Sequence, residues 1–142
     1  MESPITKKRV LFVCTHNAAR SQMAEGLLRA LYGDLYDVAS AGTEPGNVSP
    51  YAVRVMSEIG IDIGAHHSKS VQEFLGQQFD YVVTVCNNAK EACPYFPGGK
   101  KIVHQSFTDP SALMGMEEEI MAGFRQIRDE IRSWIENEFV NS

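Results

Sequence analysis

Val10-Leu-Phe-Val-Cys14-Thr-His-Asn-Ala-Ala-Arg20-Ser21 is the stretch that decides the fold. Its apolar first half predicts a buried strand that ends at Cys14. Apolar residues then recur at helical spacing, at Met23, Leu27, Leu28 and Leu31. A loop between a strand and a helix start can turn its N–H groups inward, and the positive end of the helix dipole lies at the same place. The stretch predicts a cradle for a tetrahedral oxyanion.

Cys14 is the expected nucleophile of this cradle. A free cysteine is often only a small buried hydrophobe, but this one ends a strand and precedes a helix. Backbone donors and the Arg20 guanidinium favour the thiolate form of a nearby cysteine. The planar guanidinium of Arg20 can donate two parallel hydrogen bonds to two oxygens of the oxyanion. The predicted oxyanion site consists of Thr15, His16, Asn17, Ala18, Ala19, Arg20 and Ser21.

Length and composition favour one globular domain over residues 1–142. The chain is 44% hydrophobic, has a formal net charge of −5, and its basic residues are scattered, which argues against nucleic-acid binding. No apolar run approaches the ~20 residues of a membrane span, and no leader pattern follows Lys7–Arg9, so we expect a cytoplasmic monomer.

The three cysteines, Cys14, Cys86 and Cys93, are too few for a secreted disulfide scaffold. Cys86 and Cys93 lie too far apart for the usual zinc spacing, and His66 and His67 supply no convincing second pair of ligands. The prediction is that the protein has no metal and no cofactor.

The remaining pattern alternates strands and helices. Strands are predicted at Tyr36–Ala41, Tyr81–Cys86 and Lys101–His104, the second of them buried on both faces. Ser49-Pro50 begins a helix that Gly60 ends, and a short helical segment is predicted at Val71–Leu75. The predicted buried face of the helix that begins at Ser49-Pro50 consists of Ala52, Val53, Met56 and Ile59. A last helix is predicted with a buried face of Ile120, Phe124, Ile127, Ile131, Trp134 and Ile135.

This alternation predicts an α/β fold of three layers, α/β/α, around a four-stranded parallel sheet of order 2-1-3-4. Ligands of such sheets bind beyond the carboxyl ends of the strands. Cys14, Cys86 and Asp109 follow three different strands, so we expect them to meet at that edge.

The chain resembles the thioredoxin-coupled arsenate reductases, which are built on the low-molecular-weight protein tyrosine phosphatase fold. The resemblance is carried by Cys14-x5-Arg20-Ser21 with Gln22 to Glu25, by Ser40-Ala-Gly42, by Cys86-x6-Cys93 and by Asp109-Pro110. The phosphatase branch typically has proline where this chain has Gln22, and tyrosines where it has Ser111-Ala112.

The resemblance implies the roles of the site residues. Asp109 would protonate the leaving oxygen, although on sequence alone it reads as a turn residue before proline. Ser21 would donate a hydrogen bond to the Cys14 thiolate. Cys86 would attack the Cys14 adduct and release arsenite, and Cys93 would then attack Cys86. Thioredoxin would reduce the resulting Cys86–Cys93 disulfide. Residues 87–92 are expected to change conformation when that disulfide forms.

Some relatives bind potassium near the loop through residues that match Asn17, Glu25 and Ser40. The segment His66–Lys69, where further ligands would lie, has no carboxylate, so we expect Asn17 to brace the loop and Glu25 to be an ordinary acid of the first helical turn. Two alternatives to arsenate reduction stay open. One is a phosphatase for phosphomonoesters, and the other is a noncatalytic sensor of oxyanions or redox state. Phosphate and sulfate are expected to compete with arsenate.

Overall fold

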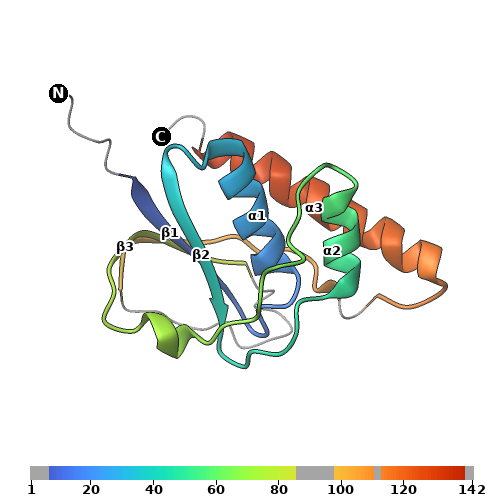
Figure 1. The fold of residues 1–142 in the computed structure, drawn as a ribbon, viewed down its shortest axis with the longest axis horizontal. Coiled ribbons are helices and arrows are strands. Elements are labelled where there is room, and N and C mark those ends of the chain that lie inside the picture. The colour runs from blue at the N-terminus through green and yellow to red at the C-terminus, as the bar shows by residue number, and fades with distance from the viewer. Residues whose placement is uncertain (1–6, 86–97, 111–112, 140–142) are drawn as a thin grey trace.

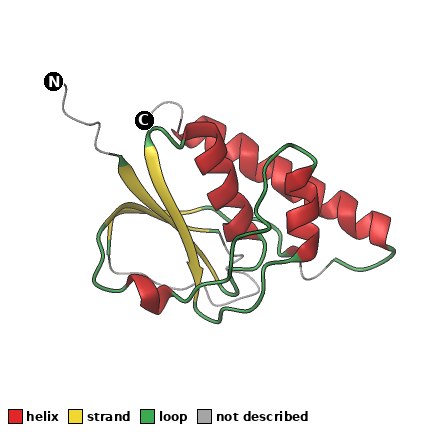
Figure 2. Ribbon diagram, in the orientation of Figure 1, coloured by secondary structure: helices red, strands yellow, loops and turns green. Residues whose placement is uncertain are grey.

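The computed structural model describes residues 7–85, 98–110 and 113–139. Cys86, Cys93, Ser111 and Ala112 therefore lie outside the described residues. The elements, in chain order, are β1 (Lys8–Cys14), α1 (Arg20–Tyr32), β2 (Tyr36–Gly42), α2 (Pro50–Ser57), the 3-10 helix η1 (Val71–Phe74), β3 (Phe79–Thr84), β4 (Gly99–His104) and α3 (Glu117–Phe139) (Figures 1 and 2).

The four strands form a parallel sheet of order β2-β1-β3-β4, as predicted. Cys14 at the end of β1 pairs with Gly42 at the end of β2. Val13 pairs with Thr84 of β3, and Thr84 pairs with His104 of β4. All four carboxyl ends thus meet at one edge of the sheet, where the loop after Cys14 begins.

The two faces of the sheet are covered unequally. α1, α2 and α3 pack together on one face, where their apolar side chains join Val10, Phe12 and Val83 in the larger core (Figure 1). On the other face, the described residues contribute the four-residue η1, whose Val71 and Phe74 pack on a smaller cluster. Helices thus contact both faces as expected, but the second layer is thin.

The strand boundaries differ from the prediction by one or two residues. β3 runs from Phe79 to Thr84 instead of Tyr81–Cys86, although the Val85 N–H still donates to the Val13 carbonyl at 3.0 Å. β4 begins at Gly99, two residues before the predicted Lys101. A Cβ on Gly99 would lie 2.6 Å from a methyl group of Val82, so glycine is required for this close pairing.

The buried faces of the helices were predicted in part. In α3 the residues Phe124, Ile127, Ile131 and Ile135 are buried as expected, but Ile120 and Trp134 are only half-buried. In α2 the buried residues are Ala52, Val55 and Met56, and the helix ends at Ser57, before the predicted Gly60. These residues have the i, i+3, i+4 spacing of one helix face, which the prediction did not apply to Val55, and the predicted Val53 and Ile59 are only half-buried. None of the helices in the described part of the chain is long and apolar enough to cross a membrane.

Candidate active site

The carbonyl groups of the loop after Cys14 point outward and accept hydrogen bonds from the segment that follows β2. The carbonyls of Thr15, His16 and Ala18 accept hydrogen bonds from the backbone N–H groups of Glu44, Gly46 and Ser49, at 2.8, 3.3 and 2.8 Å. No described peptide bond is cis, and in a trans peptide the N–H points opposite to the C=O. The N–H groups that follow these carbonyls therefore face the concave side of the loop. This is the cradle that the sequence predicted.

Gly42 lets the loop pass close to the end of β2. A Cβ at this position would lie 2.5 Å from the Thr15 carbonyl oxygen and 2.9 Å from the Asn17 nitrogen. Asn17 itself has a positive φ of 52°, which asparagine tolerates better than most residues. The tight bend of the loop thus depends on these two residue types.

A buried chain of hydrogen bonds leads from the loop to Cys14. The Asn17 amide nitrogen donates to the hydroxyls of Ser21 and Ser40, at 2.8 and 2.9 Å. The Ser40 hydroxyl donates in turn to Glu25, at 2.6 Å. Ser21 therefore keeps its own hydrogen for the Cys14 sulfur, 3.2 Å away, and can donate to a thiolate. Asn17 braces the loop through its amide, as expected.

The orientation of the Asn17 amide is set by its other partners. Its oxygen accepts hydrogen bonds from the backbone N–H of Lys69, at 2.8 Å, and from the side-chain nitrogen of Gln22, at 2.9 Å. Both partners are donors, so the amide nitrogen must face the two serines. The direction of every hydrogen bond from Glu25 to Cys14 follows from these contacts.

The prediction for Glu25 was wrong. It is not in the first turn of α1, which has no acidic residue, and its side chain is buried with 4% exposed. Its carboxylate forms ion pairs with Arg29, at 2.8 Å, and with Lys69, at 3.7 Å. A buried carboxylate requires such partners, because water no longer stabilises its charge. Glu25 thus anchors the polar network behind the loop.

The same contacts leave no room for the potassium ion that the resemblance implies. The Asn17 oxygen already accepts two hydrogen bonds, and the Lys69 ammonium faces Glu25 where a cation would sit. A second cation about 4 Å from this ammonium would be repelled by about 4 kcal/mol at an effective dielectric constant of 20. The residues present therefore do not fit a potassium site.

His66 supports the network from the solvent side. Its Nδ1 lies 2.9 Å from the side-chain oxygen of Gln22, and its Nε2 lies 3.3 Å from an Arg29 nitrogen. The Gln22 oxygen can only accept, so Nδ1 carries the hydrogen and Nε2 accepts from Arg29. Burial lowers the pKa of His66 below its ordinary value; Glu25 opposes this, whereas Arg29 and Lys69 add to it. The neutral ring is therefore the form that fits.

Sequence reasoning missed Gln22, His66 and Lys69 as parts of the site. Gln22 and Glu25 are polar residues among the apolar positions of α1, and that irregularity was the available signal. Nothing local points to His66 or Lys69, because they reach α1 from a loop more than 40 residues away in sequence.

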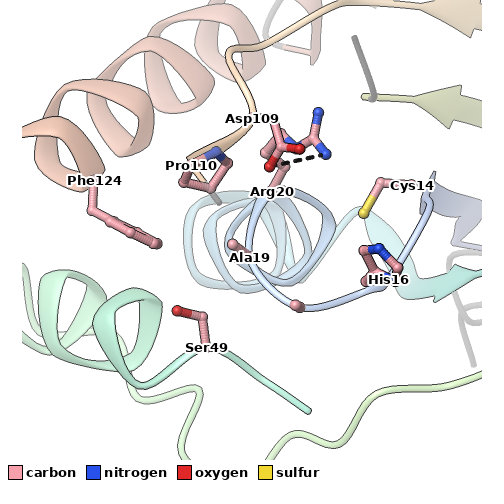
Figure 3. A pocket seen from close by; sticks show the side chains of 9 residues that line it. Cys14, His16, Ala19, Arg20, Ser49, Asp109, Pro110 and Phe124 are labelled. Atoms are coloured by element: carbon pink, nitrogen blue, oxygen red, sulfur yellow. Dashed lines mark ion pairs between the residues drawn. The ribbon is translucent and has the colours of Figure 1, made fainter. Parts of the chain in front are cut away.

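Cys14, Arg20 and Asp109 line one cavity of about 100 Å³ (Figure 3). Arg20 is buried, and its guanidinium donates to the Phe107 carbonyl at 3.4 Å and lies 3.7 Å from the Asp109 carboxylate. Asp109 remains 30% exposed at the cavity wall. The structure thus brings the predicted nucleophile, anion-binding arginine and acid together, whereas the predicted Cys86 and Cys93 lie outside the described residues.

Comparison with known sequences agrees with this geometry. Residues 9–139 match the family described as low molecular weight phosphotyrosine protein phosphatase. An arsenate reductase of Halalkalibacterium halodurans is 47% identical over 127 residues, which cover 89% of this chain and 91% of that protein. An arsenate reductase of Bacillus subtilis (strain 168) is 43% identical over 124 residues, covering 87% of this chain and 89% of that protein.

Solved structures resemble the whole fold. An arsenate reductase in its reduced state has a TM-score of 0.77 at 29% identity, and one in a phosphate-binding state has a TM-score of 0.75 at 29% identity; each comparison covers 94% of this chain and 98% of the other. A thioredoxin-dependent arsenate reductase of Corynebacterium glutamicum has a TM-score of 0.65 at 28% identity and covers 96% of this chain and 64% of that one. The cradle, the cavity and the match over residues 9–139 lead to one conclusion: this chain belongs to the low molecular weight phosphotyrosine protein phosphatase family.

Proposed function

We propose that this protein reduces arsenate to arsenite, with Cys14 as the first nucleophile. The observation that carries the proposal is the single small cavity lined by Cys14, Arg20 and Asp109 at the mouth of the N–H cradle. Relatives that are 47% and 43% identical over most of their length are arsenate reductases, which supports arsenate as the oxyanion.

The first step forms a bond between the Cys14 sulfur and arsenic. The loop N–H groups and Arg20 hold the oxyanion oxygens and stabilise the charge that builds up on them. The hydrogen bond from Ser21 favours the thiolate before attack. One arsenic–oxygen bond breaks, and Asp109 gives its proton to the leaving oxygen, which departs as water. Arsenic is still As(V) in the Cys14 adduct.

The second step is the reduction. The Cys86 thiolate attacks the Cys14 sulfur, the sulfur–arsenic bond breaks, and its electron pair stays on arsenic, which leaves as arsenite. Two thiols have then become a Cys14–Cys86 disulfide. The hydrogen bond from Val85 to Val13 keeps the chain beside the end of β1 one residue before Cys86, which supports an approach within the ~7 Å between Cα atoms that a disulfide needs.

The relay ends when Cys93 attacks Cys86 and frees Cys14. A thioredoxin then supplies two electrons to the Cys86–Cys93 disulfide. The spacing of these two cysteines supports this step, as does the likeness to the thioredoxin-dependent enzyme of Corynebacterium glutamicum.

Hydrolysis of phosphomonoesters is the second candidate function. Cys14, Arg20 and Asp109 would act in the same way on phosphorus, and water would then break the cysteinyl intermediate. The family to which the chain belongs supports this candidate, and so does a phosphatase from T. tengcongensis with a TM-score of 0.74 at 25% identity. Cys86 and Cys93 would have no part in it.

The test is arsenate turnover with thioredoxin, thioredoxin reductase and NADPH. Cys14→Ser is expected to abolish turnover. Cys86→Ser is expected to stop the reaction at the Cys14 adduct, and Cys93→Ser is expected to stop it at the Cys14–Cys86 disulfide. Mass mapping after one turnover is expected to find a Cys86–Cys93 bridge. Full turnover by Cys86→Ser would contradict the relay.

Phosphate binding serves as the control for the serine variants, because Cys86→Ser and Cys93→Ser are expected to retain it. Hydrolysis of a small phosphomonoester without arsenate turnover would favour the phosphatase. Binding of oxyanion without turnover of either substrate would favour a sensor.

A further inference from the structure

The cavity of the candidate site has two chemically different ends. Cys14, Arg20 and Asp109 form the polar end, where the cradle lies. Phe124 and Pro110 form the other end, together with Ala19 of the loop (Figure 3). Figure 3 shows Cys14 and Phe124 on opposite sides of the cavity.

The apolar end is a firm wall. Phe124 is 4% exposed and its ring packs on that of Tyr51, 5.4 Å away between centroids. The Pro110 carbonyl accepts a hydrogen bond from the Leu113 N–H at 3.1 Å, which helps to hold Pro110 in place. Ser49, the one polar side chain at this end, accepts a hydrogen bond from the Ala52 N–H as the N-cap of α2. The Ser49 hydroxyl keeps its own hydrogen, but the rest of this end consists of Ala19, Pro110 and Phe124 and therefore suits an alkyl group.

The volume limits what can lie there. An enclosed apolar cavity of about 150 Å³ binds benzene in a well-studied case, whereas this cavity measures about 100 Å³ with its anion-binding end included. The space beyond the anion thus corresponds to one or two carbon atoms. A phenyl group does not fit between the anion and Phe124.

We propose that the site binds monosubstituted tetrahedral oxyanions, the alkyl arsonates and phosphonates, in which the substituent is methyl or ethyl. Three oxygens lie in the cradle against Arg20, and the alkyl group replaces the fourth oxygen and contacts Pro110 and Phe124. This inference rests on the proposed function only in that the same cradle holds the anion.

The test measures binding of phosphate, methylphosphonate, ethylphosphonate and phenylphosphonate by calorimetry, at a pH where all four are dianions. Methylphosphonate is expected to bind at least as tightly as phosphate, and ethylphosphonate about fourfold more tightly than methylphosphonate, as one buried methylene allows. Phenylphosphonate is expected to bind more weakly than either alkyl compound.

Phe124→Ala enlarges the apolar end and is expected to reverse this order in favour of phenylphosphonate. Phe139→Ala is the matched control, because Phe139 is also buried in α3 but packs against Tyr36 and Trp134, outside the residues that line this cavity. It is expected to keep the wild-type order. If Phe124→Ala fails to fold, Phe124→Leu is the second variant. It is expected to shift the relative affinity towards phenylphosphonate by a smaller amount.

Methylphosphonate that binds tenfold more weakly than phosphate would overturn the inference, as would an unchanged order in the Phe124 variants. Failure of phosphate itself to bind would overturn both this inference and the proposed function. An alkyl preference in a protein that does not reduce arsenate would refute only the proposed function.

Discussion

Two carboxylates in this fold gather several cationic side chains, and they do so in opposite surroundings. Glu25 is buried behind the Cys14 loop with Arg29 and Lys69. Glu58 follows α2 at the surface, where Arg125 and Arg128 of α3 contact it at 2.7 and 3.0 Å. The hydrogen bond from Arg125 lowers the pKa of Glu58 to about 2, and Arg128 adds to the shift.

The two clusters differ in what they are connected to. Glu25 is connected to Cys14 through Ser40, Asn17 and Ser21, and the Asn17 amide donates towards both ends of this chain. Glu58 only joins the end of α2 to α3. An ion-pair cluster can belong to the active site or can only join two helices. The hydrogen bonds that connect it to other residues decide which of the two it does.

Glu25→Gln should give the largest effect. Loss of a buried charge leaves Arg29 and Lys69 without their partner, so the free energy of unfolding is expected to fall by about 3 kcal/mol. The amide can also reverse the direction of the Ser40 bond, which should slow alkylation of Cys14 by iodoacetamide roughly tenfold. Urea unfolding and peptide mass spectrometry measure the two effects. Unchanged Cys14 reactivity would show that the chain of hydrogen bonds does not reach the sulfur.

Lys69→Met should have the second largest effect. It keeps the backbone contact with Asn17 but removes the ammonium beside Glu25, at an expected loss of about 1.5 kcal/mol in unfolding free energy. Lys100→Met, at a lysine whose side chain is 72% exposed, is the control and should change little. The wild-type melting temperature is expected to be equal in potassium chloride and choline chloride. A specific stabilisation by potassium would contradict the misfit inferred from Lys69.

His66 predicts a pH dependence of stability. Its pKa is lower in the folded protein than the ordinary value of 6.5, so the unfolded chain binds more protons below that pH. Stability is expected to be complete above pH 6.5 and to fall with decreasing pH, with a slope of at most about 1.4 kcal/mol per pH unit. His66→Gln should flatten this slope in urea titrations between pH 5 and 7. A wild-type protein that gains stability as the pH falls from 7 to 5 would refute the assignment.

Glu58→Gln should have the smallest effect. Glu58 and Arg125 are exposed to solvent and screened by salt, and Arg128, although buried, keeps its hydrogen bond to the Val55 carbonyl. A slight decrease in melting temperature is therefore expected at neutral pH, and it should shrink in 1 M sodium chloride. Because the pKa of Glu58 is lowered to about 2, the advantage of the wild type should disappear as the pH falls from 4.5 towards 2. The rate of Cys14 alkylation should stay at the wild-type value. A changed rate would show that the Glu58 cluster is coupled to the Glu25 cluster.

Much of the fold could be predicted because its signals are local. The apolar run before Cys14, the alternation of strands and helices and the spacing in α3 led to the observed strand order. The start of β4 at Gly99 was not predicted, because the need for glycine at this position comes from Val82 on the neighbouring strand. Val53 was predicted to be buried in place of Val55, although Ala52, Val55 and Met56 share one face at the i, i+3, i+4 spacing.

The chemistry of the site divides in the same way. By itself, the sequence determined the thiol at a strand end, the loop that turns its N–H groups inward and the arginine that follows, because these residues are neighbours and local backbone geometry joins them. Only the tertiary structure decided that Glu25 is a buried anchor, that Lys69 faces it, and that the cavity ends on Phe124. Contacts between residues tens of positions apart depend on how the layers pack, and no local pattern records that packing.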